Sequence, residues 1–286
     1  MSGGLPIVRL FGIEIRISLA WAVVLAMVAL IGVQQAAATA PQLMGPIHWV
    51  IGAVVALGFL ASVIAHELGH ALVGRGCGVE TTSIQLGFVG GLAPLSIEAS
   101  RPRDELAIAL AGPVISLVLA AVALPLAMMI GPDGGGLSAV GGGLLVVGGL
   151  NLVLACLSLL PGMPLDGGRV VRALAWGRTG DRYRAGKITA QVGRILGWST
   201  VGLGLALAFV DYVTEGILLL LFGWLLATGA RTLDRRLGLE ALLHGSTGGE
   251  ATRREVPHVP PNLTIDTFAG RYEGEDKISS LVVVED

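Results

Sequence analysis

The dominant pattern along the chain is a series of apolar stretches, each long enough to cross a lipid bilayer as a helix of about 20 residues. Polar and charged residues gather mainly in the connections between these stretches. Six stretches are found, at residues 17–37, 48–73, 105–130, 137–160, 188–210 and 214–232. The pattern therefore predicts an all-α polytopic membrane protein with six transmembrane helices within residues 1–232.

The connection between the second and third stretches differs from both a helix and an ordinary loop. In this connection Ile84, Leu86 and Phe88 alternate with polar or small residues, which is the period of a strand. Gly90 and Gly91 follow and supply the flexible backbone that a tight turn needs. We expect a small strand or hairpin here, with Gly90 and Gly91 as its turn.

Composition supports the membrane assignment and limits the partners. Hydrophobic residues make up 53% of the 286 residues and charged residues 14%, whereas soluble proteins contain about 25% charged residues. The net charge of -2 gives no general attraction to nucleic acid, so none is expected as a partner. Two cysteines, Cys77 and Cys156, match no zinc or redox spacing and are interpreted as packing residues.

The basic residues predict which helix ends face the cytoplasm. Lys and Arg are absent from residues 38–47, 131–136 and 211–213, whereas residues 74–104 contain three and residues 161–187 contain six. Because positively charged loops remain inside the cell, the basic connections, the strand element and both termini are assigned to the cytoplasm. A competing interpretation of the first stretch, a cleaved signal peptide, would leave the other helices in the same orientation.

The segment AHELGHAL in the second predicted helix contains ionisable residues where a bilayer makes them costly. His66 and His70 are four residues apart and therefore share one face of a helix. On that face two imidazoles can bind one zinc ion, while Glu67, one position further round, can act as general base for the attacking water. The alternative is that the two histidines only brace the helix bundle.

A catalytic zinc usually has three protein ligands, so one more is needed. His48 lies at the opposite membrane face, and His244 and His258 lie in the tail. Asp166 is a better candidate, because the fourth predicted helix runs in the same direction as the second and delivers it to the same boundary. His66 lies roughly 12 Å from that boundary at about 1.5 Å per residue. An Asp-Gly pair is also a common turn signal, and that interpretation stays open.

Three segments resemble the site-2 protease family of intramembrane zinc metalloproteases: HELGH in the second predicted helix, ALAGPVISL in the third and LLPGMPLDGGRV at the end of the fourth. The resemblance covers roughly residues 8–232. It implies that His66, His70 and Asp166 bind one zinc ion and that Glu67 is the general base. The active site is then expected near the cytoplasmic side of the bilayer.

The same resemblance implies a substrate and a location. The substrate is a membrane-spanning protein cut within or beside the bilayer, for example a membrane-anchored signalling regulator, in a bacterial or archaeal cell membrane. An extended substrate segment is expected to add to the strand region around Gly90 and Gly91. One residue departs from the family pattern, since Ser158 stands where the family has an Asn before Leu-Leu-Pro. Ser158 or Asn151 is the candidate substitute for binding the substrate, although Asn151 also suits an interhelical hydrogen bond.

Two other functions remain open at this point. A metal-binding transporter would need ionisable residues along a path to the outer face, and the outer halves of the predicted helices contain almost none. A protein of this fold that binds membrane partners without cutting them is the second. The intact His-Glu-His-Asp set argues against it, and Ser158 is the residue that keeps it open. The oligomeric state does not follow from the sequence.

The residues after the last predicted helix form two further segments. Residues 233–250 are expected to form a short amphipathic helix and a linker. Residues 251–286 contain a proline-led extended start, a short helix from Asn262 and a strand at 279–284. This order is similar to the first half of a cystathionine-β-synthase-type (CBS) domain, and the segment is too short to bury a core of its own. We interpret it as an incomplete CBS-like segment, with a disordered tail as the alternative. The resemblance implies an adenosine nucleotide as a ligand of the complete region.

Overall fold

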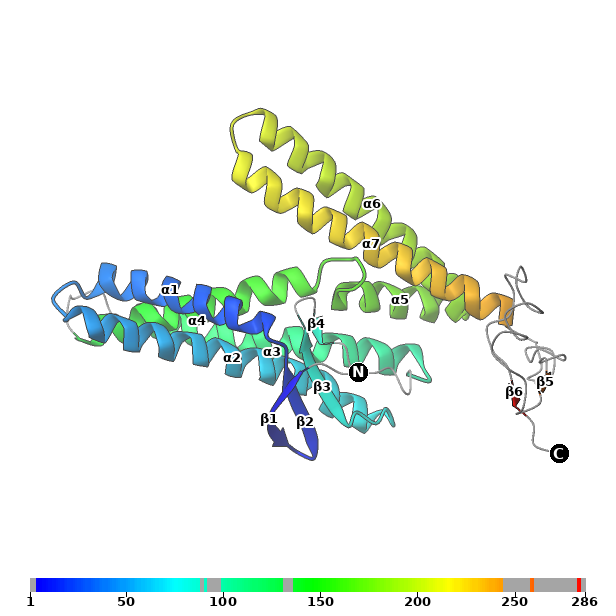
Figure 1. Ribbon diagram of the computed structural model, residues 1–286, viewed down its shortest axis with the longest axis horizontal. Coiled ribbons are helices and arrows are strands. Elements are labelled where there is room, and N and C mark those ends of the chain that lie inside the picture. The colour runs from blue at the N-terminus through cyan, green and yellow to red at the C-terminus, as the bar shows by residue number, and fades with distance from the viewer. Residues whose placement is uncertain are drawn as a thin grey trace. The chain divides into compact units, whose positions relative to one another are not determined.

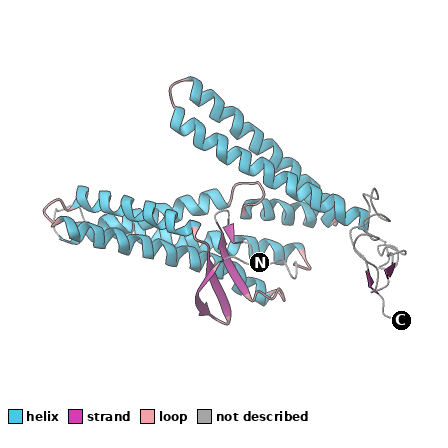
Figure 2. Ribbon diagram, in the orientation of Figure 1, coloured by secondary structure: helices cyan, strands magenta, loops and turns pink. Residues whose placement is uncertain are grey.

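The structure, a computed structural model, contains two compact units, residues 1–237 and residues 238–286. It describes residues 4–87, 90–91, 99–130, 136–243, 258–259 and 282–283. Helices dominate the first unit (Figure 2). In the second unit, strands β5 (His258–Val259) and β6 (Val282–Val283) pair in parallel. The short helix predicted from Asn262 lies outside the described residues.

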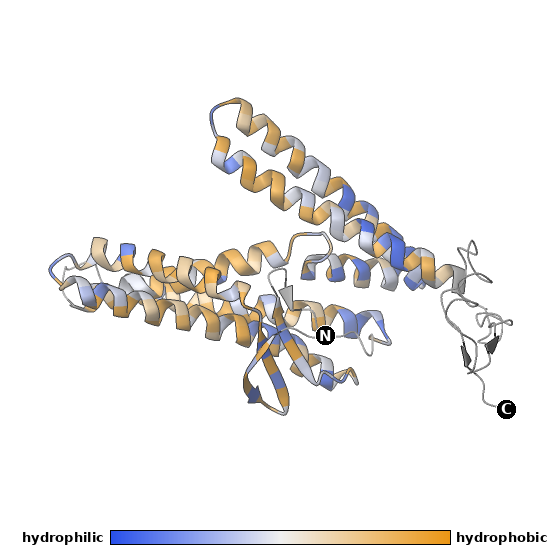
Figure 3. Ribbon diagram, in the orientation of Figure 1, coloured by the Kyte–Doolittle hydropathy of each residue, from blue (hydrophilic) through white to orange (hydrophobic). Residues whose placement is uncertain are grey.

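Six helices of the described chain are long and apolar enough to cross a membrane, which confirms the predicted architecture. Their bounds are α1 Ala20–Thr39, α2 Gly45–Gly76, α3 Pro102–Ile130, α4 Gly136–Ser158, α6 Arg182–Phe209 and α7 Val213–Leu243. Hydrophobic residues run along these helices (Figure 3). Large apolar side chains such as Met27, Val122 and Leu218 are exposed on them, as expected of surfaces that contact lipid. Helices α1 to α4 pack against one another as a bundle (Figure 1).

Two helical segments differ from the expected bounds. A seventh helix, α5 (Asp166–Thr179), lies in what was expected to be only a basic connection. This helix contains several charged residues and therefore does not form a long apolar stretch in the sequence. The residues buried in it are small, such as Gly167 and Ala173. Helix α7 continues to Leu243, so the helix expected after residue 232 is an extension of the sixth span.

A four-stranded sheet lies at the end of the bundle where α1 begins, α2 ends and α3 begins, called here the sheet end. Its strands are β1 (Leu5–Leu10), β2 (Ile13–Ile17), β3 (Ser83–Gly87) and β4 (Gly90–Gly91), in the order β1-β2-β3-β4. Strands β2 and β3 are parallel, and the other two pairs are antiparallel. The hairpin β1–β2 was not predicted, although three isoleucines alternate with charged residues in β2.

The prediction that Gly90 and Gly91 form the turn is wrong. Gly91 is paired with Leu86 and Gly90 with Gly87, so both glycines belong to strand β4. Glycine signals backbone freedom but does not distinguish a turn from a strand that lacks side chains. Residues 88–89, between the two strands, lie outside the described residues.

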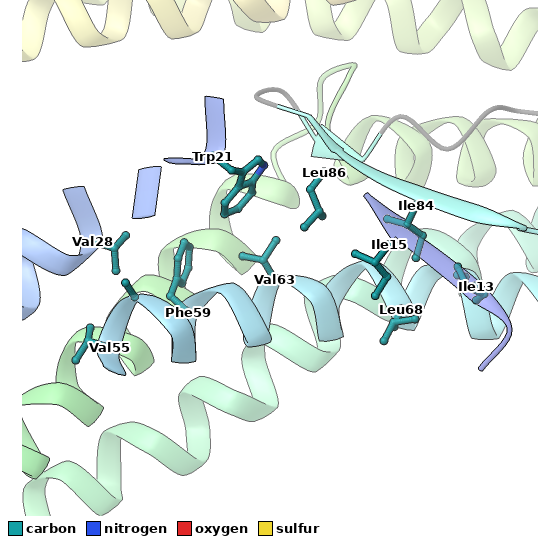
Figure 4. Close-up of a cluster of buried hydrophobic side chains, with 12 residues drawn as sticks. Ile13, Ile15, Trp21, Val28, Val55, Phe59, Val63, Leu68, Ile84 and Leu86 are labelled. Carbon is teal, nitrogen blue, oxygen red and sulfur yellow. The ribbon is translucent and has the colours of Figure 1, made fainter. Parts of the chain in front are cut away.

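One face of the sheet packs on the bundle and forms the main hydrophobic core (Figure 4). Ile15 of β2 and Leu86 of β3 are buried in the same cluster as Val63 and Leu68 of α2. The backbone N–H of Ser18 donates to the Leu86 carbonyl at 3.1 Å. The indole N–H of Trp21 also donates to the sheet, at the Gly87 carbonyl and 3.1 Å. These contacts hold the sheet beside the part of α2 that contains the HELGH motif.

Candidate metal centre

Helix α2 presents His66 and His70 to the interior of the bundle, as the i, i+4 spacing requires. His66 is buried and His70 is half-buried. Their Nε2 atoms lie 3.2 Å apart, and the two rings meet edge to face with their centroids 4.9 Å apart. Glu67, the next residue of the same helix, is half-buried beside them. The two imidazoles therefore converge on one point.

Asp166, the first residue of α5, completes this group. Its Oδ2 atom lies 3.4 Å from Nε2 of His66 and 3.3 Å from Nε2 of His70. The two glycines that follow explain how the chain delivers it. A Cβ at Gly168 would lie 2.8 Å from the Met163 nitrogen, and one at Gly167 would clash with the carbonyls of Leu159 and Leu160, which directly follow α4. Their absent side chains let the start of α5 fold back against the end of α4.

The spacing of the three donor atoms fits a zinc ion. Zinc binds such ligands in a tetrahedron with bonds of about 2.0–2.1 Å, which places neighbouring donors about 3.3–3.4 Å apart. The observed separations are 3.2, 3.3 and 3.4 Å. Two imidazoles and one carboxylate are also a donor set that catalytic zinc uses.

The other ring nitrogens of the histidines are held by α3. The Nδ1 atom of His70 lies 2.6 Å from the carbonyl oxygen of Ile108. Because a carbonyl only accepts, Nδ1 must donate, and Nε2 of the neutral ring is left as a lone-pair donor for a metal. The Nδ1 atom of His66 bonds the Ser116 hydroxyl at 2.9 Å. These contacts orient both rings toward Asp166.

Gly112 of α3 leaves open the space that a metal ion requires. A Cβ at this position would lie 2.6 Å from Nε2 of His66 and still closer to Nε2 of His70. That is nearly the length of a zinc–nitrogen bond from both ligands. Any residue other than glycine would therefore place carbon beside or within the position of the metal. The same helices also approach closely at Gly69, where a Cβ would lie 3.1 Å from the Ala111 carbonyl oxygen.

A buried ion pair joins α3 to α5. Glu105 is 1% exposed, and the Arg172 Nε donates to its Oε1 at 2.6 Å. Asp166, Arg169 and Arg172 recur every three residues and so follow one side of α5. Burial lowers the pKa of Arg169, and the carboxylates of Glu105 and Asp166 act in the opposite direction. Helix α5 is thus attached to α3 close to the point where it presents Asp166.

The charge of Asp166 follows from its contacts. Burial by itself raises the pKa of this carboxyl, but its contacts with the His66 and His70 rings outweigh burial and lower the pKa well below its usual range. The group is therefore a carboxylate at neutral pH. That is the form in which a metal binds it.

Asn151 and Ser158, the candidate substitutes for the family Asn, both bond within the bundle. The Asn151 Nδ2 donates to Ser62 Oγ at 3.0 Å and to the Val147 carbonyl at 2.9 Å. The Ser158 hydroxyl donates to the Ala155 carbonyl at 3.1 Å. Ser62 lies one helical turn before His66, so Asn151 is adjacent to the metal-centre helix. A role for either residue in substrate binding stays a prediction.

Sequence reasoning assigned no role to several groups that shape this centre. Gly112 and Ser116 lie within ALAGPVISL, the segment that carried only a resemblance. Glu105 could have been noticed as an acidic residue in the first turn of a membrane span. The pairing of Arg172 with Glu105 could not have been predicted from the sequence, because α5 and α3 come together only in the folded chain.

Comparison with known proteins places the chain in a family. Residues 54–143 match peptidase family M50. A protein of Synechocystis that carries the name zinc metalloprotease is 34% identical over 273 residues, which are 95% of this chain and 70% of that protein. The chain belongs to peptidase family M50, the site-2 protease family. It is accordingly a site-2 protease-type zinc metalloendopeptidase and a multi-pass membrane protein.

Further relatives agree with this assignment. The zinc metalloprotease Rip3 of Mycobacterium tuberculosis is 34% identical over 243 residues, or 84% of this chain and 61% of that protein. The site-2 protease structure from Methanocaldococcus jannaschii superposes with a TM-score of 0.52 at 26% identity, over 80% of this chain and 94% of that chain. The chain thus spans between three fifths and 70% of the M. tuberculosis and Synechocystis relatives.

Proposed function

We propose that this M50 protein hydrolyses a peptide bond in or near the transmembrane helix of a membrane protein, using one zinc ion held by His66, His70 and Asp166. The supporting observation is the convergence of three donor atoms at tetrahedral spacing around the space left by Gly112. The family and its zinc metalloprotease relatives support zinc as the metal.

Glu67 is the general base in this proposal. Zinc bound here would polarise the scissile carbonyl and make water more acidic. The Glu67 carboxylate accepts a proton as the water oxygen bonds to the carbonyl carbon, and it returns that proton to the amine as the carbon–nitrogen bond breaks. Asp166 stays ionised throughout, and the bonds of His66 and His70 to α3 keep both rings aligned.

The substrate segment is proposed to unwind and add to the edge of β4, because a helix hides its own peptide bonds. Gly90 and Gly91 have no side chains that would obstruct a close backbone partner. Among the described residues, the buried Oδ1 of Asn151 has no hydrogen-bond partner and could accept from a substrate or a water. Ser158 would assist from the end of α4.

The charged connections support a proposal for the orientation in the membrane. The sheet end is proposed to face the cytoplasm of a bacterial or archaeal cell, with both termini on that side. Regulated cleavage of a membrane-anchored signalling protein would suit such a site. The CBS-like segment 251–286 lies mostly outside the described residues, and its adenosine nucleotide ligand stays a proposal, tested by nucleotide binding to a chain with the complete region.

A Glu67→Gln variant tests the mechanism. We expect it to retain zinc while cleavage of a reconstituted membrane substrate falls about 10²–10⁴-fold, because only the proton acceptor is lost. Glu80→Gln, which changes an exposed glutamate just after α2, is the matched control and should cleave normally. Retained cleavage in Glu67→Gln would exclude this residue as the base. A zinc-loaded wild-type chain that binds but never cuts any membrane substrate would support the binding function instead.

Asp166→Ala tests the third ligand separately. We expect zinc content to fall well below one ion per chain, measured by atomic emission on the purified protein. Fragments of membrane proteins that appear in cells with the wild-type chain and disappear with Glu67→Gln would identify the substrate.

A further inference from the structure

The β1–β2 hairpin exposes several large apolar side chains. Strand β1 is an edge strand, and Leu5 is 68% exposed and Ile7 48% exposed on it. Phe11, at the tip of the hairpin, is 69% exposed. Exposed apolar groups gathered on one element mark a surface that contacts something other than water.

The backbone of the tip is unfavourable for the residue it contains. Phe11 has a φ of 51° and Gly12 a φ of 79°, both in the left-handed region. Glycine adopts this region freely, but a bulky side chain does so rarely and at a cost. Burial of the Phe11 side chain does not offset this cost, because the side chain is exposed. A strained, exposed aromatic residue indicates a role outside the packed core.

Two arginines flank this apolar tip. The Arg75 Nη1 donates to the Phe11 carbonyl at 2.9 Å, and the Arg9 Nε donates to the Gly12 carbonyl at 3.4 Å. Both arginines are exposed. The tip therefore combines an outward aromatic ring with two guanidinium groups. Lipid at a membrane surface fits this combination, since acyl chains accept the ring and phosphates accept the cations.

The position of the hairpin agrees with that environment. Strand β2 ends at Ile17 and the membrane span α1 begins at Ala20, so only two residues carry the chain from the sheet into the bilayer. In Figure 1 the β1–β2 ribbon runs across the direction of α1 and α2 rather than continuing along it. The hairpin thus stays at the level where the spans begin.

The edge of β1 is poorly suited to another strand. Pro6 has no N–H to donate, and the register with β2 shifts between Pro6 and Val8. Proline and bulges are features that discourage pairing along an edge. Lipid is therefore a better occupant than a second copy of the chain or an added substrate strand.

We propose that the β1–β2 hairpin is a membrane-interface anchor, with Phe11 and Ile7 at the boundary of the acyl chains and Arg9 and Arg75 at anionic headgroups. Because β1 to β4 form one sheet, the anchor also sets the depth of β4 relative to the bilayer. This second step rests on the proposed function, in which β4 receives the substrate segment.

A depth measurement tests the anchor without requiring activity. Cys77 and Cys156 are replaced by Ser, an environment-sensitive fluorophore is attached to Ile7→Cys, and the protein is placed in vesicles of phosphatidylglycerol and phosphatidylcholine. We expect lipids brominated near the headgroup to quench the fluorophore and aqueous iodide not to reach it. A fluorophore at Glu80→Cys, in the exposed connection after α2, should show the reverse. Free access of iodide to position 7, or shielding that is independent of bromolipid, overturns the proposal.

A cleavage assay tests the consequence for β4. We expect Phe11→Asp to slow cleavage of a bilayer-embedded substrate several-fold and to leave cleavage of the same substrate in detergent unchanged. Equal rates in the bilayer would overturn the link between the hairpin and the depth of β4. If the wild-type chain cleaves in neither medium, the proposed function fails, and bromolipid quenching alone decides whether the hairpin is an anchor.

Discussion

Glycine serves opposite purposes in two regions of this molecule. In the α6–α7 pair, a Cβ at Gly197 would lie 2.6 Å from the Ala227 nitrogen, and one at Gly204 would lie 2.7 Å from the Gly216 oxygen. There the backbone of the partner helix occupies the space that a side chain would fill, so the two helices approach closely, as is usual for helices packed in lipid. At Gly112 the neighbouring atoms are imidazole nitrogens, and the space suits a metal. A close contact therefore reveals its purpose only through the atoms that surround it.

Polar groups differ between the same two regions. In the metal centre, His70 and Glu105 are directed at fixed partners on neighbouring helices and are largely shielded from water. Between α6 and α7, Asp234 meets Lys187 at 2.8 Å and Arg194 at 3.3 Å, with all three side chains partly exposed. Water and salt can replace the second set but not the first. Substitutions should consequently have unequal effects in the two regions.

Gly112→Ala should have the largest effect. The added methyl group would displace the histidines or the metal, so we expect zinc content to fall and cleavage to drop by about 10²-fold or more. Atomic emission and a cleavage assay measure both quantities, and circular dichroism checks that the helices persist. Gly149→Ala on α4, where a Cβ would meet nothing within 4 Å, is the matched control. Full zinc content in Gly112→Ala would show that this space does not serve the metal.

Breaking the Glu105–Arg172 pair should have the next largest effect. Arg172→Met leaves the Glu105 charge buried without its counter-ion, which typically costs about 3–5 kcal/mol. We expect a lower thermal unfolding temperature in detergent and weaker zinc binding, since α5 carries Asp166. The double variant Glu105→Gln with Arg172→Met removes both charges and should recover part of the loss. Additive losses in the double variant would mean that the two residues act independently.

Gly197→Ala should destabilise the α6–α7 pair but spare the metal. Forcing a methyl group between packed helices costs about 1–3 kcal/mol. Unfolding in detergent should therefore begin at a lower temperature, while zinc content stays at the wild-type value. Gly202→Ala on the same helix has nothing within 4 Å of its Cβ and should be neutral or stabilising. Loss of zinc in Gly197→Ala would show that packing between α6 and α7 also affects the metal centre, which contradicts the difference proposed between the two regions.

The sequence revealed the parts of this molecule that leave a local signal. Runs of apolar residues predicted the six spans, and the HELGH spacing identified two histidines that the structure brings together with Asp166. Asp166 could be proposed from the sequence as the third ligand, because the direction of each predicted span and the depth of a residue within it follow from counting residues along the helix.

The parts that escaped sequence reasoning depend on contacts between distant segments. Helix α5 is too polar on average to stand out among the long apolar stretches, and the pairing of Arg172 with Glu105 joins positions 67 residues apart. Strand β4 was mistaken for a turn because glycine suits both. The role of Gly112 could not be predicted from the sequence, since nothing along the chain indicates which atoms lie next to the position of its missing Cβ.

The smallest effect concerns the two carboxylates, Asp166 in the metal centre and Asp234 between α6 and α7. The pKa of Asp166 is lowered in the folded chain, so the stabilisation it represents is present above the unfolded value of about 3.9 and is lost only as pH falls through the lower folded value. Asp166 therefore stays ionised between pH 8 and about pH 4. A loss of zinc affinity between pH 8 and about pH 4 should therefore not come from protonation of Asp166.

Chelator competition at a series of pH values measures this directly. We expect the logarithm of the zinc affinity to fall with decreasing pH with a slope that stays below three protons per zinc above pH 4, because Asp166 takes up none there. Asp234→Asn should give the same curve, because that carboxylate contacts only Lys187 and Arg194 among the described ion pairs. A slope that approaches three above pH 4 would mean that Asp166 also takes up a proton in that range, which would contradict its lowered pKa.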